Sequence, residues 1–152
     1  MGGIIRGKVT QTGVDTFTIG AIDTNLTIDG KAGWLITKMT CFWEDGYTAA
    51  AADQTISGIL ATQATVTTPS DNEELARVNW AVANTAGVAV AYPMELQKSV
   101  SPPVDRITAQ PAIYFQVSST GTGLANDVYY EVEYEIVKLT DIEVLRLLVG
   151  GA

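Results

Sequence analysis

Short apolar runs, separated by glycine, proline, aspartate and asparagine, recur along nearly the whole chain. Most of them are rich in Val, Ile, Thr and aromatic residues, and several alternate between apolar and polar positions, which is typical of β-strands. They predict strands at residues 4–10, 14–19, 26–28, 34–43, 55–62, 76–83, 112–118 and 128–139. Because these strands do not alternate with long helical segments, the pattern predicts an all-β protein.

Two Asp-Gly pairs, at residues 29–30 and 45–46, interrupt the first half of the chain. Type I′ hairpin turns need positive φ at both central positions, and Asp-Gly meets that need. The pairs therefore predict that the chain folds back at both points into antiparallel strands. Residues 84–106 contain three prolines, which cannot donate to a sheet ladder, so this stretch is predicted to be a long connection with little regular structure.

The number and length of the strands indicate a fold class. About eight short antiparallel strands in 152 residues are typical of a two-sheet antiparallel β-sandwich, either a jelly roll or an immunoglobulin-like Greek key. Long connections at residues 44–54 and 84–106 favour the jelly roll. We expect one domain, with the sandwich at residues 1–139 and a helical tail of the same domain at residues 140–152.

That tail and residues 71–75 are the two segments with helical character. Each follows a capping box, formed by Ser70 and Glu73 in the first segment and by Thr140 and Glu143 in the second. In the tail, four apolar residues follow at helical spacing: Ile142, Leu145, Leu148 and Val149. A helix this short is marginal alone. These four side chains must therefore pack on the sandwich or on a neighbouring molecule, and they are the candidate assembly contacts.

The last predicted strand places three glutamates on one face. Side chains alternate along a strand, so Glu131, Glu133 and Glu135 point the same way. The other face is apolar and is assigned to the core: Val128, Tyr130, Val132, Tyr134 and Ile136. Carboxylates about 7 Å apart repel one another and stay charged only where water, a cross-strand base or a cation compensates. The row is either a solvated outer face or a candidate intersubunit contact or cation-binding face.

Charge and residue types limit the chemistry. Nine basic against seventeen acidic residues give a net charge of −8 with no run of Lys or Arg, so strong binding to nucleic acid is not expected. The chain has no histidine and one cysteine, Cys41, which excludes the usual zinc sites, Cys-His nucleophiles and Ser-His-Asp triads. Cys41 is interpreted as a small core side chain. We expect neither an enzyme nor a cofactor.

Targeting and membrane signals are absent from the sequence. The first residues contain no apolar segment of signal-peptide length, and no stretch approaches the ~18 apolar residues of a membrane span. The protein is therefore expected to be soluble or part of an assembly, without membrane insertion. Outside an assembly it is expected in the cytoplasm.

The ending VYYEVEYEIVKLTDIEVLRLL, in which a long last strand runs into a terminal helical segment, carries a resemblance together with the strand count and the long loops. The chain resembles the single-jelly-roll coat proteins of small icosahedral viruses and phages. The resemblance implies a virion shell subunit that associates with itself, and with other capsid proteins, through sheet edges, loops and termini. Many such coats carry an Arg-rich arm, whereas residues 1–9 contain only Arg6 and Lys8. Genome contact through a basic tail is therefore not implied.

Two other functions fit the same pattern. One is a decoration protein bound to another shell. The other, from a different class, is a non-catalytic ligand- or carbohydrate-binding β-sandwich module, which would be a monomer or small oligomer with an exposed aromatic platform. The size of the purified particle distinguishes a shell from a binding module.

Overall fold

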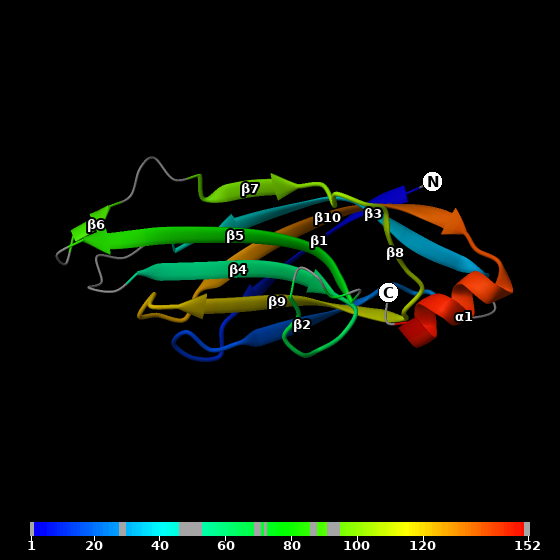
Figure 1. The fold of residues 1–152 in the computed structure, drawn as a ribbon, viewed down its shortest axis with the longest axis horizontal. Coiled ribbons are helices and arrows are strands. Elements are labelled where there is room, and N and C mark those ends of the chain that lie inside the picture. The colour runs from blue at the N-terminus through cyan, green and yellow to red at the C-terminus, as the bar shows by residue number, and fades with distance from the viewer. Residues whose placement is uncertain are drawn as a thin grey trace.

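The computed structural model describes residues 2–27, 30–45, 53–68, 71, 73–85, 88–90 and 95–150. These residues contain ten strands and one helix, arranged as two stacked sheets with the helix at one end (Figure 1). The elements are β1 (Gly2–Thr10), β2 (Thr18–Asp23), β3 (Ala32–Trp43), β4 (Gln54–Ala61), β5 (Glu74–Thr85), β6 (Val88–Val90), β7 (Gln97–Val100), β8 (Arg106–Thr108), β9 (Ala112–Thr120), β10 (Asp127–Lys138) and α1 (Asp141–Gly150).

Strand pairing is nested about the middle of the chain. β1 pairs with β10, β2 with β9, β3 with both β7 and β8, and β4 with β5, all antiparallel. One sheet has the order β1-β10-β3-β7, with β8 also beside β3, and the second has the order β2-β9-β4-β5-β6. A long hairpin rolled up into two facing sheets has this nested pairing, which defines a jelly roll. The predicted all-β, two-sheet antiparallel sandwich is confirmed.

A β-bulge explains why the inward-facing positions of β3 change from even-numbered to odd-numbered residues along the strand. The register between β3 and β10 shifts between Glu133 and Tyr134, which leaves Thr37 of β3 as the extra residue. The Thr37 hydroxyl donates to the backbone carbonyl of Glu133 at 3.0 Å. One extra residue reverses which positions face inward. The buried side chains are accordingly at even-numbered positions before the bulge and at odd-numbered positions after it: Trp34, Ile36, Met39, Cys41 and Trp43.

Aromatic side chains fill the space between the sheets. Trp43 of β3 meets Trp80 of β5 with ring centroids 6.0 Å apart, and Phe115 of β9 meets Tyr130 of β10 at 4.6 Å. Cys41 is fully buried in the same core. Burial raises the pKa of its thiol to about 12. The interpretation of Cys41 as a core side chain is confirmed.

A buried polar network joins the two sheets at the end of β10 away from α1. Asn126 is fully buried at its centre, and the Asn126 side-chain oxygen accepts from Trp43 Nε1 at 2.9 Å. The Asn126 amide nitrogen donates to Gln11 Oε1 at 2.7 Å and to Thr122 Oγ1 at 2.9 Å. Gln11 lies between β1 and β2, and Thr122 lies between β9 and β10. The network therefore ties together two of the places where the chain crosses from one sheet to the other.

Asp15 anchors the same crossovers through its carboxylate. Asp15 Oδ1 accepts from Ser119 Oγ at 2.8 Å and from the backbone N–H of Thr122 at 3.1 Å. The Thr122 hydroxyl donates to the same oxygen at 2.5 Å. Partial burial raises the pKa of Asp15, but hydrogen bonds from Thr122, Ser119 and Gly123 favour the carboxylate and together lower the pKa below its ordinary value of 3.8.

Asp15 is expected to make the free energy of unfolding depend on pH in acid. Because its pKa is lower in the folded than in the unfolded chain, its stabilising contribution is present above the unfolded value and is lost as the pH falls through the folded value. Asp15→Asn should therefore lose less stability than wild type between about pH 5 and pH 2. Asparagine also tolerates the positive φ of 48° found here. Urea midpoints across that range measure the difference, with the exposed Asp105→Asn as control; equal slopes for Asp15→Asn and wild type would contradict the assignment.

The two hairpins predicted at the Asp-Gly pairs are wrong. β2 and β3 lie in different sheets, and so do β3 and β4, so the chain crosses between sheets at these points instead of folding back. Residues 28–29 and 46–52 of these connections lie outside the described residues. The strand predicted at residues 14–19 begins only at Thr18, because the preceding residues form the crossover that Asp15 anchors.

The helical turn predicted at residues 71–75 does not form among the described residues. Glu74 and Leu75 belong to β5. Asp71 closes a turn instead: the Asp71 N–H donates to the Thr68 carbonyl at 2.9 Å, and the Asp71 carboxylate accepts from the Thr68 N–H at 2.7 Å. The apolar alternation that runs through β5 outweighs the capping-box signal.

The connection predicted at residues 84–106 contains more regular structure than expected. β6 and β7 lie within it, and β8 begins at its end. β7 and β8 pair with different parts of β3, and Pro102 and Pro103 lie between them, where no ladder bond is needed. The prolines therefore interrupt an edge strand and do not exclude one.

Candidate contact surfaces

Helix α1 follows β10 after a two-residue connection and lies at one end of the sandwich (Figure 1). Thr140 and Glu143 form the predicted capping box: the Thr140 N–H donates to the Glu143 carboxylate at 2.6 Å, and the Glu143 N–H donates to Thr140 Oγ1 at 3.2 Å. The hydrogen bond from the Thr140 backbone is the main cause that lowers the pKa of Glu143. The predicted C-terminal helix is confirmed.

One side of α1 packs on its own sandwich. Val144 is only 2% exposed, and Gln110 Nε2 donates to the Leu148 carbonyl at 3.3 Å. At the start of the helix, Lys31 Nζ lies 3.3 Å from the Asp141 carboxylate. Val144 is not among the four predicted contact residues. Its spacing of four residues from Leu148 is the sequence signal that identifies this side of the helix.

The opposite side of α1 is apolar and faces away from the sandwich. Ile142 is 72% exposed and Leu145 is 57% exposed, and residues three apart lie on the same side of a helix. Leu148 is half-buried, and the side chain of Val149 lies outside the described residues. Of the four candidate assembly contacts, the structure therefore places Ile142 and Leu145 on the outward side of α1.

The three glutamates lie on the outer face of the β1-β10-β3-β7 sheet. Arg6 of β1 is directly opposite Glu131, with Arg6 Nε 2.6 Å from its carboxylate. Lys38 of β3 is directly opposite Glu133, with Lys38 Nζ 3.8 Å away. Glu135 is exposed. Cross-strand bases thus match two of the three carboxylates, and such exposed pairs stabilise a fold by only about 0–1 kcal/mol each.

The inner face of β10 follows the predicted alternation except at its end. Val128 and Val132 are fully buried, but Ile136 is 47% exposed, so its assignment to the core is wrong. Gly2, the first described residue of β1, pairs with Glu135. Among the described residues, β10 therefore extends past β1, and no described residue of β1 lies opposite Ile136.

A concave surface of about 590 Å³ lies on the outer face of the same sheet, near the start of β10. We refer to it as the outer groove, and its lining includes Arg6, Lys8, Lys38, Phe42, Tyr129 and Glu131. These residues come from β1, β3 and β10, which are neighbours in the sheet. The outer groove is therefore built from strands at both ends of the chain.

The outer groove combines aromatic rings with positive charge. The Phe42 and Tyr129 rings have centroids 6.1 Å apart, and their residues are 37% and 38% exposed. Lys8 Nζ lies 5.5 Å from the centre of the Tyr129 ring, and no described carboxylate lies within 4 Å of it. Arg6, by contrast, is paired with Glu131. The groove thus offers an unpaired cation beside apolar surface, on a chain whose net charge is −8.

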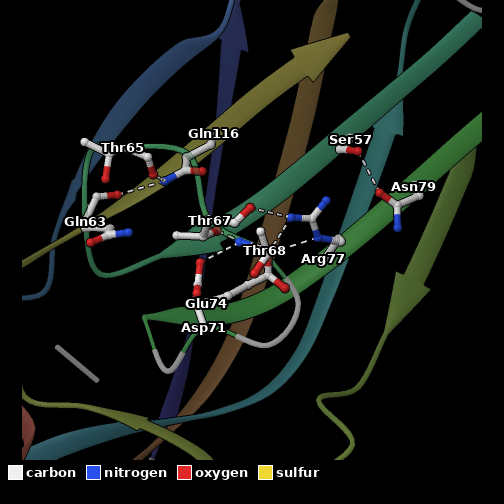
Figure 2. Close-up of polar contacts among 10 residues, drawn as sticks. All are labelled: Ser57, Gln63, Thr65, Thr67, Thr68, Asp71, Glu74, Arg77, Asn79 and Gln116. Carbon is white, nitrogen blue, oxygen red and sulfur yellow. Dashed lines mark hydrogen bonds and ion pairs between the residues drawn. The ribbon is translucent and has the colours of Figure 1, made fainter. Parts of the chain in front are cut away.

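The connection between β4 and β5 covers part of the outer face of the other sheet (Figure 2). Gln116 Nε2 of β9 donates to the carbonyls of Gln63 and Thr65, both at 2.8 Å. Arg77 of β5 donates to the Thr67 carbonyl at 2.8 Å and pairs with the Glu74 carboxylate at 2.7 Å. Figure 2 shows these side chains reaching from the strands to the connection. This connection is held in place by the strands, whereas the outer groove on the other sheet is an open concave surface.

In the part of the chain that the structure describes, no three His, Cys, Asp or Glu side chains are close enough together to hold a metal ion. Within the same residues, no helix has the length and apolar character needed to cross a membrane.

Comparisons with known proteins give structural likenesses only. No family model matches the chain, and no curated protein matches it in sequence. Its structure is similar to the acidic stable capsid structure of Helicobacter pylori bacteriophage KHP30, at 10% identity and a TM-score of 0.39, over 90% of this chain and 99% of that one. It is also similar to the structure of desmodium yellow mottle tymovirus, at 10% identity and a TM-score of 0.31, over 92% of this chain and 91% of that one. Scores this low assign no function.

Proposed function

We propose that the protein is a self-assembling structural subunit, a coat protein that forms a virion shell from copies of itself. The observation that carries the proposal is the apolar outward side of α1. Ile142 and Leu145 are exposed on a helix that Val144 already fixes to its own sandwich. Exposed apolar surface that the fold holds in place marks an interaction site.

The jelly roll is compatible with this function but does not distinguish it from other functions of the same architecture. Viral capsid proteins, lectins and cupins all use the architecture. The absence of a Lys or Arg run and the net charge of −8 favour a subunit that contacts its neighbours more strongly than it contacts a genome. Other capsid proteins are further partners in this proposal, and a decoration protein on another shell is its closest variant.

A non-catalytic ligand- or carbohydrate-binding module is the second candidate function. The observation in its favour is the exposed pair of Phe42 and Tyr129 in the outer groove. Aromatic faces of this kind stack on sugar rings or other flat ligands. Such a module would work as a monomer or small oligomer.

Light scattering and negative-stain microscopy of the purified protein separate the two functions. We expect closed, symmetric particles much larger than a single chain, whose formation depends on protein concentration. A protein that stays monomeric at high concentration, at low and high salt and across pH, would contradict the shell. Retention of that monomer on immobilised sugars would then support the binding module.

A further inference from the structure

We propose that the outer groove is the docking site for α1 of a second copy of this chain. The inference rests on the proposed self-assembly and identifies the surface that the outward side of α1 contacts. Three features carry it: the chemistry of the helix, the chemistry of the groove, and the distance between them within one molecule.

The outward side of α1 is mainly apolar. Ile142 and Leu145 are exposed there, and Glu143 adds an exposed carboxylate in the first turn. Asp141 is ion-paired within its own molecule, and Arg146 is exposed in the next turn. A surface that accepts this helix must therefore bury two branched aliphatic side chains and can place one cation beside Glu143.

The outer groove has those two properties. Its Phe42 and Tyr129 rings are half-exposed and give apolar surface, while Lys8 lies over the Tyr129 ring with no described carboxylate partner. Arg6 and Lys38 also line it, but each is paired with a glutamate of β10. Complementary charge steers two surfaces together and fixes their orientation. The groove can therefore take Glu143 of α1 beside Lys8 and the aliphatic side chains against its rings.

Distance prevents the helix from reaching the groove of its own molecule. The groove lies at Tyr129, near the start of β10, whereas α1 follows Lys138 at the other end of that strand. Nine residues of strand separate these points by roughly 30 Å. Only two residues connect β10 to α1, and they span less than about 10 Å. Docking must therefore occur between molecules.

The contact is heterologous, because a helix on one copy meets a different surface on the next. Such a contact leaves a free helix at one end of a row of subunits and a free groove at the other, so assembly continues until a ring closes or a filament forms. α1 can make this contact without detaching from its own sandwich, because Val144 holds one side of the helix there while the opposite side faces outward. This contact alone is expected to produce a ring and not a dimer, and a shell requires a second kind of contact between subunits.

A mixing experiment with two variants tests the proposal. The helix variant carries Ile142→Ser and Leu145→Ser and keeps its groove, and the groove variant carries Lys8→Glu and keeps its helix. We expect each variant alone to associate at least about tenfold more weakly than wild type. Mixed, they should form a one-to-one complex that does not grow, because each copy then has one usable surface. Lys138→Glu, the same charge change on the exposed far end of β10, is the matched control and should assemble as wild type.

Sedimentation velocity and native mass spectrometry record the outcomes. Assembly of the groove variant at wild-type concentration would overturn the docking site, and so would the absence of a one-to-one complex in the mixture. If the helix variant alone is also indistinguishable from wild type, the proposed role of α1 in assembly fails as well, so the two failures are distinguishable. A second groove variant, Tyr129→Ser, repeats the test without a charge change, and circular dichroism melting confirms that each variant is folded.

Discussion

Replacing Ile142 and Leu145 together with serine is expected to leave a folded protein that no longer associates. Both side chains are more than half exposed in the single chain, so their loss removes little of its core. In an assembly they would be buried at every contact. Burying the parts of these two side chains that are still exposed contributes about 2–4 kcal/mol, so the double variant should weaken each contact at least about tenfold. Sedimentation velocity measures the association, and thermal melting measures the fold.

Val144→Ala is the matched control on the other side of the same helix. Val144 is buried against the sandwich, so truncating it should lower the free energy of unfolding by about 1–3 kcal/mol. Replacing the exposed Ile142 and Leu145 should not change the free energy of unfolding of a monomer. A double variant that assembles at full size with wild-type melting would show that the outward side of α1 contacts nothing.

Asn126→Leu is expected to destabilise the fold by about 2–4 kcal/mol, because it breaks the network that joins the two crossovers. The indole N–H of Trp43 loses its acceptor, and Trp43 is only 1% exposed, so water cannot replace it. Gln11 and Thr122 also lose a donor each. The midpoint of urea unfolding measures the loss.

Asn79→Leu is the control for that substitution. Asn79 lies on an exposed position of β5 and accepts a hydrogen bond only 2.6 Å long from Ser57, also at the surface (Figure 2). Water can satisfy Ser57 after the change, so the expected loss is below about 1 kcal/mol. Equal losses for the two variants would show that burial of the Asn126 network does not matter for stability.

The sequence predicts the strands well because their signals are local. Continuous or alternating apolar residues place β1, β3, β4, β9 and β10 near their observed bounds, and the capping box at Thr140 places α1. The errors arise where a local signal competes with a distant one. Asp-Gly pairs favour a hairpin locally, but β2 and β3, and likewise β3 and β4, lie in opposite sheets, so sequence adjacency does not give pairing at these points.

The contact surfaces depend on information that no local pattern carries. The sequence shows that Ile142 and Leu145 are apolar and lie at helical spacing. Only the packed structure shows that Val144 faces the sandwich and that these two side chains face away from it. The outer groove brings Lys8 beside Tyr129, which is more than a hundred residues away in sequence. The bulge at Thr37 further shifts which residues of β3 point outward. Reading the groove from sequence would require the sheet order and the register together.

Single-particle electron microscopy of the wild-type protein, at a concentration where scattering shows association, tests the central claim most directly. We expect a closed symmetric shell in which the outward side of α1, with Ile142 and Leu145, is covered by a neighbouring subunit. A monomer, or a particle in which that side of α1 faces solvent in every subunit, would contradict the claim.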